Sequence, residues 1–284
     1  MDLTANGIPQ VTLPDGTRLP ALGLGTWKMG ERTGSAAREV SALKHGLDLG
    51  MTLIDTAEMY GDGGAERIVA QAIAGRRAPA FVVSKVYPQN AGAQSMPAAC
   101  ERSLRRLRRD CIDLYLLHWR GRIPLAESVD AFERLRAAGK IRHWGVSNFD
   151  TADMEELQAL PDGIHCAVNQ VLYNLSERGI EWQLLDRCRA RHIAVMAYSP
   201  VAQGSLLTNR KLAAIARQLA VTPAQLALAW VLSRPQVVAI PQSANLAHID
   251  DNRAVAAIRL DQVVMSALDG AFPPPRGATR LAII

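Results

Sequence analysis

The strongest constraint on the fold of this chain is the regular alternation of short apolar runs with helix-like segments. Eight runs are rich in β-branched residues or leucine, as expected of buried parallel strands, and segments with helical periodicity separate them. The runs cover residues 22–26, 52–56, 81–86, 112–118, 141–147, 167–171, 193–198 and 237–241. Eight strand–helix units in 284 residues predict an α/β fold, a (β/α)8 TIM barrel, rather than a doubly wound sheet with a second domain.

Segments outside these units complete the predicted architecture. The stretch VTLPDGTRLPAL reads as a hairpin with Asp15-Gly16 in its turn, and we expect it to close the bottom of the barrel. The long helical region after the seventh run is broken at Thr222-Pro223, a pair that suits the start of a new helix. Because no linker or change of composition divides the chain, we predict a single domain over residues 1–284, with the tail AFPPPRGATRLAII as a surface loop.

Charge and cysteine content exclude several classes of protein. The net charge of +5 is small and spread along the chain, so it gives no argument for a nucleic-acid partner. In the most basic run, residues 101–110, Cys100, Leu104 and Leu107 form one apolar helix face, which leaves the arginines in solvent. The four cysteines lie far apart, so we expect neither structural zinc nor a disulfide framework. Without a signal-like start or a bilayer-length apolar run, we expect a cytoplasmic protein that does not bind membranes.

Polar residues stand at the ends of seven consecutive predicted strands. In a barrel of this type the functional residues lie at the carboxyl ends of the strands, and packing alone gives no reason for polar groups there. The seven ends carry Asp55, Ser84-Lys85, His118-Trp119, Ser147-Asn148, Asn169-Gln170, Tyr198-Ser199 and Gln242-Ser243. We therefore predict that the mouth of the barrel is a functional site.

Each titratable residue near these ends has a structural interpretation when it is taken alone. Lys85 could be a salt-bridged rim lysine, and His118 a hydrogen-bonded histidine of the barrel. Asp55 could cap the next turn, and Tyr60 could be an ordinary loop aromatic. Together they favour catalysis at one mouth. Five aromatic residues at or just beyond strand ends predict an aromatic-walled pocket for a small organic substrate, and they are Trp27, Tyr60, Tyr87, Trp119 and Tyr198.

Eight short segments occur in the order and spacing of the aldo-keto reductase family, which the chain resembles from Val11 to about Ala271. The segments are LGLGTW, LIDTAEMYG, VSKVYP, DLYLLHW, GVSNF, NQ, MAYSP and IPQS. The runs IDTAEMYGDGGAE and FPPPRG resemble most the short bacterial members of methylglyoxal reductase type. This resemblance implies a monomeric oxidoreductase that reduces small aldehydes or ketones to alcohols with NADPH, and that also accepts NADH.

The resemblance further implies a catalytic tetrad of Asp55, Tyr60, Lys85 and His118, each within its own matching segment. Carbonyl reduction needs a hydride, which a nicotinamide supplies, and a proton, which the protein supplies. We expect the Lys85 ammonium to lower the pKa of Tyr60, the proton donor, and Asp55 to hold Lys85 in place. We expect His118 to bind the carbonyl oxygen and to stay neutral, because a second positive charge would be repelled by Lys85.

The coenzyme should lie across the barrel mouth, because GLGTWK lacks the third glycine of the Rossmann fingerprint. By resemblance, the residues that contact the coenzyme carboxamide, nicotinamide ring, pyrophosphate and adenosine are Thr26, Ser147, Asn148, Gln170, Tyr198, Ser199, Val201, Gln203, Ser205, Gln242, Ser243, His248, Asp251 and Asn252. Among these, Ser147, Asn148 and Gln170 are expected at the carboxamide, and Tyr198 is expected to stack on the ring. The expected substrate contacts are Trp27, Tyr87, Trp119 and Arg120.

Two positions depart from the family pattern at the expected phosphate of the coenzyme. Members that prefer NADPH usually carry lysine and arginine where this chain has Gln242 and His248. Because neutral hydrogen bonds discriminate less than charge-assisted ones, we expect NADPH to be preferred only moderately. Arg210 or Arg253 could supply part of the missing charge.

Two other functional classes are compatible with a barrel of this kind, and the arginines after His118 allow two interpretations. A metal-dependent barrel hydrolase needs clustered histidine and carboxylate ligands at strand ends, but His118 is the only histidine at such a position, so we expect no metal. A catalytically weak, nicotinamide-binding regulatory protein of the same fold is the remaining alternative, and the intact tetrad argues against it. Arg120 and Arg122 could bind a carboxylate-bearing aldehyde or keto acid, or they could be solvated residues of the rim.

Overall fold

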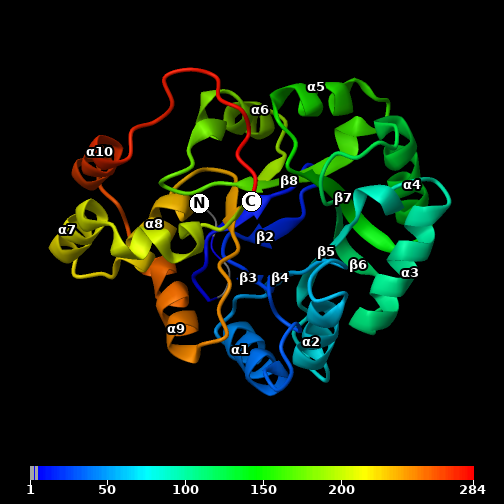
Figure 1. Ribbon diagram of the computed structural model, residues 1–284, viewed down its shortest axis with the longest axis horizontal. Helices are drawn as coiled ribbons and strands as arrows, with labels where there is room; N and C mark the ends of the chain where they lie inside the picture. The colour runs from blue at the N-terminus through cyan, green and yellow to red at the C-terminus, as the bar shows by residue number, and fades with distance from the viewer. Residues whose placement is uncertain (1–2, 4–5) are drawn as a thin grey trace.

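A closed parallel barrel forms the centre of the computed structural model, which describes residues 3 and 6–284. Its eight strands follow the order β10-β9-β8-β7-β6-β5-β4-β3. They are β3 (Leu24–Gly25), β4 (Leu53–Asp55), β5 (Phe81–Val86), β6 (Ile112–Leu117), β7 (Ile141–Ser147), β8 (Cys166–Leu172), β9 (Ala194–Tyr198) and β10 (Val237–Ala239). All eight strands fall within or across the predicted runs, so the sequence prediction of a (β/α)8 barrel is confirmed (Figure 1).

The barrel closes between its first and last strands. The amide of Gly23 donates a hydrogen bond to the carbonyl of Ala239 at 2.9 Å, and the amide of Gly25 donates to the carbonyl of Pro241 at 3.0 Å. A Cβ atom at position 25 would lie 2.7 Å from the carbonyl oxygen of Ile240, which is closer than real Cβ atoms approach an oxygen. Glycine in LGLGTW is therefore what lets the two strands meet.

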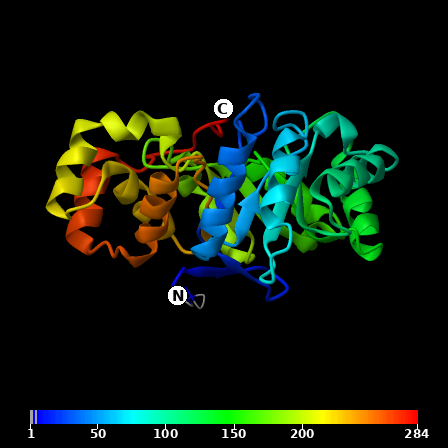
Figure 2. The same ribbon diagram turned by 90° about the horizontal axis from the view of Figure 1, so that it is seen from below.

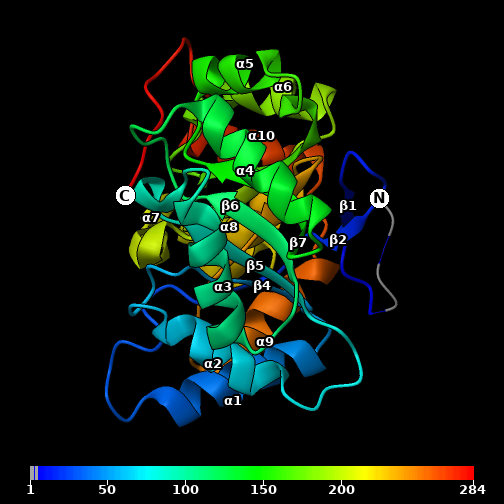
Figure 3. The ribbon, with the colours of Figure 1, turned by 90° about the vertical axis from the view of Figure 1, so that its right-hand side faces the viewer.

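Helices cover the outside of the barrel (Figures 1 and 3). They are α1 (Ala36–Asp48), α2 (Gly64–Ile73), α3 (Ser95–Leu107), α4 (Leu125–Ala137), α5 (Thr151–Ala159), α6 (Leu184–Ala190), α7 (Arg210–Gln218), α8 (Pro223–Leu232), α9 (Leu246–Ala254) and α10 (Gln262–Ala271). The predicted break before α8 is confirmed. Thr222 caps this helix by accepting a hydrogen bond from the amide of Gln225 at 3.1 Å, and Pro223 is its first residue.

The amino-terminal hairpin closes the bottom of the barrel, as predicted. Strands β1 (Gln10–Thr12) and β2 (Arg18–Pro20) pair antiparallel and lie at the end opposite the C-terminus (Figure 2). The side chain of Gln236, just before β10, donates a hydrogen bond to the carbonyl of Thr12 at 2.8 Å. The side chains of Val11, Leu13 and Leu19 are buried. They help to seal this end, which leaves the opposite end as the open mouth.

The basic run at the end of α3 follows its prediction for the apolar face but not for every arginine, since Arg109 pairs with the buried Asp113 at 2.9 Å. Its apolar face of Cys100, Leu104 and Leu107 is buried. Arg106 does not lie in solvent as expected, because its Nε donates a hydrogen bond at 2.5 Å to the buried carboxylate of Glu66 on α2. A buried carboxylate needs a partner, and the sequence pattern of α3 gave no sign of one.

The tail after α10 does not simply cover the outer surface. It returns to the carboxyl ends of the strands, where Arg280, Leu281, Ile283 and Ile284 help to line a cavity in the barrel mouth. Within the described part of the chain, no single helix has the length and apolar character needed to cross a bilayer. Helices α7 and α8 meet those limits only as a pair that bends by 82°.

Candidate active site

The carboxyl ends of the strands enclose a cavity of about 1250 Å³, and most of the predicted site residues line it. The predicted residues on its wall are Trp27, Asp55, Tyr60, His118, Trp119, Arg120, Ser147, Asn148, Gln170, Tyr198, Ser199, Val201, Gln203, Gln242, Ser243, His248, Asp251 and Asn252. They come from segments far apart in the sequence, and the barrel brings them to one mouth.

Four predicted residues do not reach the cavity wall. Thr26 is fully buried, and its Oγ1 donates a hydrogen bond to the backbone carbonyl of Asp55 at 2.9 Å, which makes it a support of the strand end. Tyr87 packs edge-on behind Trp119, with ring centroids 5.9 Å apart. The Oγ of Ser205 donates to the carbonyl of Ala202 at 2.9 Å. Lys85, the fourth, is fully buried behind Tyr60, which does line the cavity.

Lys85 is a fully buried ammonium with three acceptors around it. Its Nζ lies 2.8 Å from Oδ2 of Asp55, 2.9 Å from the carbonyl oxygen of Thr56 and 3.1 Å from the hydroxyl oxygen of Tyr60. An ammonium has three protons to donate and cannot accept, so these contacts use all of them. The Tyr60 oxygen therefore accepts from Lys85, and its own proton is free to point into the cavity.

Burial, as well as charge, controls the proton of Tyr60. Burial raises the pKa of this phenol by more than the Lys85 ammonium lowers it, and the Asp55 carboxylate adds to the rise. The Lys85 charge acts on the pKa in the expected direction, but burial outweighs it, because sequence reasoning counted the charge of Lys85 and not the desolvation of the phenolate. Tyr60 is thus protonated at neutral pH, as a proton donor must be.

Lys85 itself keeps its charge. Burial alone would lower the pKa of this ammonium, but the neighbouring Asp55 carboxylate and the Tyr60 oxygen outweigh burial and raise it. A fixed positive charge 3.1 Å from the Tyr60 oxygen would stabilise the phenolate that forms when the proton leaves. The geometry therefore provides both the proton and a counter-charge for the group that loses it.

His118 is neutral and presents one ring nitrogen to the cavity. Burial and the Lys85 charge lower the pKa of His118 to about 2. Its Nδ1 is buried and has no hydrogen-bond partner among the described residues. The ring lines the cavity, so Nε2 is the nitrogen that reaches it. The ring stands at 74° to that of Tyr60, with centroids 5.8 Å apart, which places two polar groups at one side of the cavity.

We expect His118 to make the fold sensitive to acid. Between the folded pKa of about 2 and the ordinary value of 6.5, the unfolded chain binds a proton that the folded chain rejects, so stability falls as the pH drops below 6.5. One pH unit corresponds to about 1.4 kcal/mol. Urea unfolding should show that the wild type loses about 2 kcal/mol more than His118→Gln between pH 7 and pH 5. Equal losses would show that His118 accepts a proton in the folded state.

Gln170 makes a contact that the sequence did not predict. Its Nε2, on β8, donates a hydrogen bond at 2.8 Å to Oδ1 of Asp55, on β4 at the opposite side of the barrel. A carboxylate can only accept, so the amide nitrogen must face Asp55 and the amide oxygen must face away. Both oxygens of Asp55 are then engaged, one by Lys85 and one by Gln170. No signal in the sequence links these strands.

A second group of contacts fixes the other side of the mouth. The hydroxyl of Tyr198 donates a hydrogen bond to Oδ1 of Asn148 at 2.9 Å, and Nδ2 of Asn148 donates to the carbonyl of His118 at 3.2 Å. Asn148, Ser199 and Gln203 have the left-handed backbone conformation, with φ of 59°, 47° and 53°. Such strained backbone is uncommon outside glycine and gathers at functional sites.

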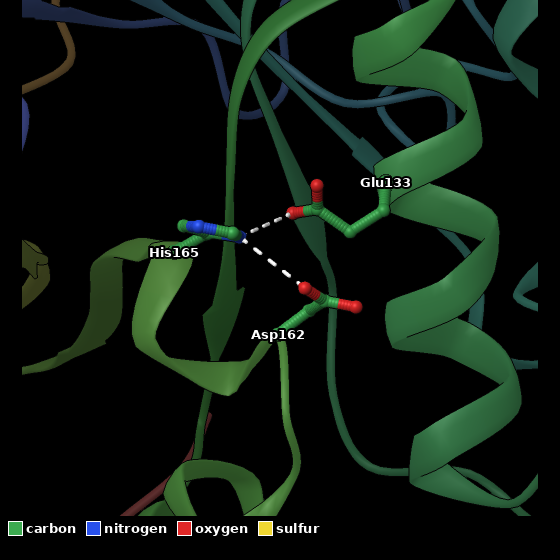
Figure 4. A group of neighbouring side chains, drawn as sticks. All are labelled: Glu133, Asp162 and His165. Carbon is green, nitrogen blue, oxygen red and sulfur yellow. Dashed lines mark hydrogen bonds and ion pairs between the residues drawn. The ribbon is translucent and has the colours of Figure 1, made fainter.

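Among the described residues, one cluster of possible metal ligands lies away from this cavity. Figure 4 shows Glu133 of α4 beside His165 and Asp162, with ligand atoms within 4.8 Å of one another. Glu133 already accepts hydrogen bonds from Nε1 of Trp144 at 2.6 Å and from Arg136 at 2.5 Å. With the Arg136 guanidinium and the Trp144 indole as its donors, this carboxylate already has a counter-charge and a hydrogen bond, and we assign the cluster a structural role.

Comparison with known proteins identifies relatives over almost the whole chain. The model of the aldo/keto reductase family matches residues 21–272. Methylglyoxal reductase YeaE of Escherichia coli is 52% identical over 271 residues, which cover 94% of this chain and 95% of that protein. Glyoxal reductase of Bacillus subtilis is 36% identical, with 91% of each chain covered. An aldo-keto reductase from Klebsiella pneumoniae, solved in complex with NADPH, has a TM-score of 0.95 at 50% identity and covers 98% of this chain and 99% of its own.

Proposed function

This chain belongs to the aldo/keto reductase family, and we propose that it reduces small neutral aldehydes with NADPH, among them 2-oxoaldehydes such as methylglyoxal. The observation that carries the proposal is the buried Lys85–Tyr60 contact of 3.1 Å beneath a cavity that His118 also lines. The test is a steady-state assay of the purified protein with NADPH and a panel of aldehydes and ketones. A rate no higher than the uncatalysed reaction with every compound would leave only the alternative, a regulatory protein that binds the coenzyme.

The cavity suits a dinucleotide coenzyme together with a small substrate. Its volume of about 1250 Å³ exceeds the roughly 300–1,000 Å³ that is usual for one small ligand. Because Nε2 of Gln170 is used by Asp55, the Oε1 of Gln170 is the atom left to accept a hydrogen bond, as the N–H of a carboxamide would require. Ser147, the last residue of β7, pairs with Gln170, and Asn148 follows it. Tyr198 lines the same cavity, where its ring would stack on the nicotinamide.

The residues of the chain have distinct tasks in the proposed reaction. Bound NADPH supplies the hydride. Tyr60 would donate its free proton to the carbonyl oxygen, and Lys85 would stabilise the phenolate that remains. In the tautomer with its proton on Nε2, the neutral His118 ring would donate a hydrogen bond to the same oxygen and orient the carbonyl. Asp55 holds Lys85, and Gln170 holds Asp55, so both act through another residue rather than on the substrate.

The two residues expected at the coenzyme phosphate, Gln242 and His248, bring little positive charge. Gln242 and His248 line the cavity together with Asp251, which is acidic. The suggestion that Arg253 supplies charge is wrong, because its Nε donates at 2.9 Å to the carbonyl of Leu49, and its Nη2 donates to the carbonyl of Asn6. Arg210 does not line the cavity either. A 2′-phosphate would thus receive a neutral hydrogen bond from Gln242 in place of a charge-assisted one from lysine, and the cations left on the cavity wall are Lys28, Arg120 and Arg280.

We therefore expect NADPH to be preferred over NADH by less than about 100-fold in kcat/KM, since each factor of ten needs about 1.4 kcal/mol. Gln242→Lys should increase the preference, most clearly at low salt, because it adds a charge-assisted hydrogen bond. Gln218→Lys is the matched control, since it adds the same charge to an exposed position at the end of α7, away from the cavity. A preference above a thousandfold that Gln242→Lys does not change would place phosphate recognition elsewhere.

Three broader assignments also remain proposals. We infer that residues 1–284 form one domain, that the protein is a cytoplasmic monomer, and that it binds neither nucleic acid nor membranes. A single calorimetric transition would support one domain. Light scattering at assay concentration tests the monomer, and cell fractionation tests the location.

A further inference from the structure

Arg120 is a cationic residue on the cavity wall, and its guanidinium is already paired with a carboxylate of the protein. It follows His118 by two positions and lines the cavity together with Asp150 and Asp153. Its Nη1 and Nη2 donate hydrogen bonds to the two carboxylate oxygens of Glu156 at 3.0 and 2.8 Å. Such a two-pronged pair is the geometry in which arginine binds a carboxylate. The side chain of Glu156, which does not itself line the cavity, therefore uses the two terminal nitrogens with which Arg120 would bind a carboxylate on a substrate.

The fold holds these acids near Arg120. Asp150 and Asp153 form the capping box that begins α5, and the Nη1 of Arg120 also lies 3.5 Å from Oδ1 of Asp153. Glu156 follows one turn later on the same helix. One positive charge thus stands near three negative ones, and two of these, Asp150 and Asp153, line the cavity beside Arg120. Arg122, the second arginine that the sequence offered for an anionic substrate, does not line the cavity.

We propose that the Arg120–Glu156 pair sets the charge specificity of the pocket, admitting neutral carbonyl compounds and rejecting those that carry a carboxylate. This inference rests on the proposed reductase function and names the substrate class of the same site. Glu156 is the specificity-determining residue, because its removal would free the Arg120 guanidinium to pair with an incoming carboxylate. Glu156 should therefore affect the reduction of aldehydes that carry a carboxylate and leave the reduction of otherwise identical neutral aldehydes unchanged.

The expected effect is modest, because the pair is partly open to water. The side chain of Arg120 is 32% exposed and that of Glu156 is 54% exposed, and exposed ion pairs contribute little in water. A substrate carboxylate that replaces the Glu156 contact should therefore change kcat/KM by roughly 3- to 10-fold rather than by orders of magnitude. The gain should shrink at high salt, since screening weakens exposed charge pairs.

The test compares succinic semialdehyde with its methyl ester, two aldehydes that differ in the charge of one end. We expect the wild type to favour the ester, and Glu156→Gln to raise kcat/KM for the acid by roughly 3- to 10-fold while leaving the ester unchanged. Glu155→Gln is the matched control, because Glu155 on the same helix pairs with Arg187 rather than with Arg120. The double variant Glu156→Gln/Arg120→Gln should lose the gain, which assigns it to the guanidinium.

Each possible result supports the proposal or overturns it. A gain that appears in Glu156→Gln, is absent in Glu155→Gln and disappears in the double variant supports it. Equal gains in Glu155→Gln and Glu156→Gln would reflect net charge alone and overturn it, as would a wild type that prefers the acid. Reduction of the aldehyde group of the methyl ester by the wild type tests the proposed reductase function separately. A wild type that does not reduce this neutral aldehyde would contradict the reductase function, and not the proposed role of Glu156.

Discussion

Replacing Tyr60 with phenylalanine is expected to lower kcat for aldehyde reduction by roughly 10²–10⁴, the usual contribution of a positioned general acid. The substitution keeps the ring, which is 8% exposed, but removes the proton that faces the cavity. The Lys85 charge stays paired with Asp55 at 2.8 Å, so the fold should tolerate the change. The measurement is kcat under saturating aldehyde and NADPH, with wild type and variant compared at the same pH.

Two controls separate loss of the proton from loss of the site. Coenzyme affinity, measured by fluorescence, should be nearly the same in Tyr60→Phe, because the expected carboxamide contacts are on β7 and β8. Tyr115→Phe removes another buried hydroxyl, from a ring that packs against Phe132 outside the cavity, and should leave kcat unchanged. Near-wild-type turnover by Tyr60→Phe would exclude this residue as the proton donor.

Replacing Lys85 with methionine is expected to remove most activity and much of the stability as well. The variant loses the charge that stabilises the Tyr60 phenolate, so kcat should fall by at least about 10². It also leaves the Asp55 carboxylate, which is 2% exposed, buried without its cation, a defect that usually costs about 3–5 kcal/mol. Kinetics and urea unfolding should therefore both show large effects, and the pH profile should change more than the KM for aldehyde.

A second substitution distinguishes the two effects. Adding Asp55→Asn to Lys85→Met neutralises the stranded carboxylate, so stability should largely recover while kcat stays low. Asp55→Asn alone should be milder than Lys85→Met, because the ammonium remains near the Tyr60 oxygen. If Asp55→Asn proved as severe as Lys85→Met in a folded protein, the carboxylate would need a direct part in the reaction.

The barrel could be predicted from the sequence because its signals are local. A buried parallel strand reads as a short apolar run and a covering helix as a 3.6-residue period, so eight repeats leave few topologies. The same reasoning found the mouth, since the carboxyl ends of parallel strands must lie at one end of the barrel. Asp55, Lys85 and His118 were identified in this way, and the resemblance placed Tyr60 beside them.

The sequence could not assign partners across the barrel. Gln170 and Asp55 are 115 residues apart and on opposite strands, and no periodicity connects them. Arg120 and Arg253 looked equally available as cations in the sequence, yet one pairs with Glu156, and the other binds backbone carbonyls and does not line the cavity. The tail, which has no helical or strand pattern, also gave no sign that it lines the mouth.

The proton of Tyr60 shows why this division arises. The sequence placed a lysine near this tyrosine and so determined the sign of one Coulomb interaction. Whether that interaction exceeds the cost of desolvation depends on how deeply both groups are buried, which only the packing of the whole barrel decides. Sequence thus determined which groups are present and the order of the strands that carry them. The tertiary structure decided which charges meet, which are neutralised and which face the cavity, because those outcomes depend on distance and on the exclusion of water.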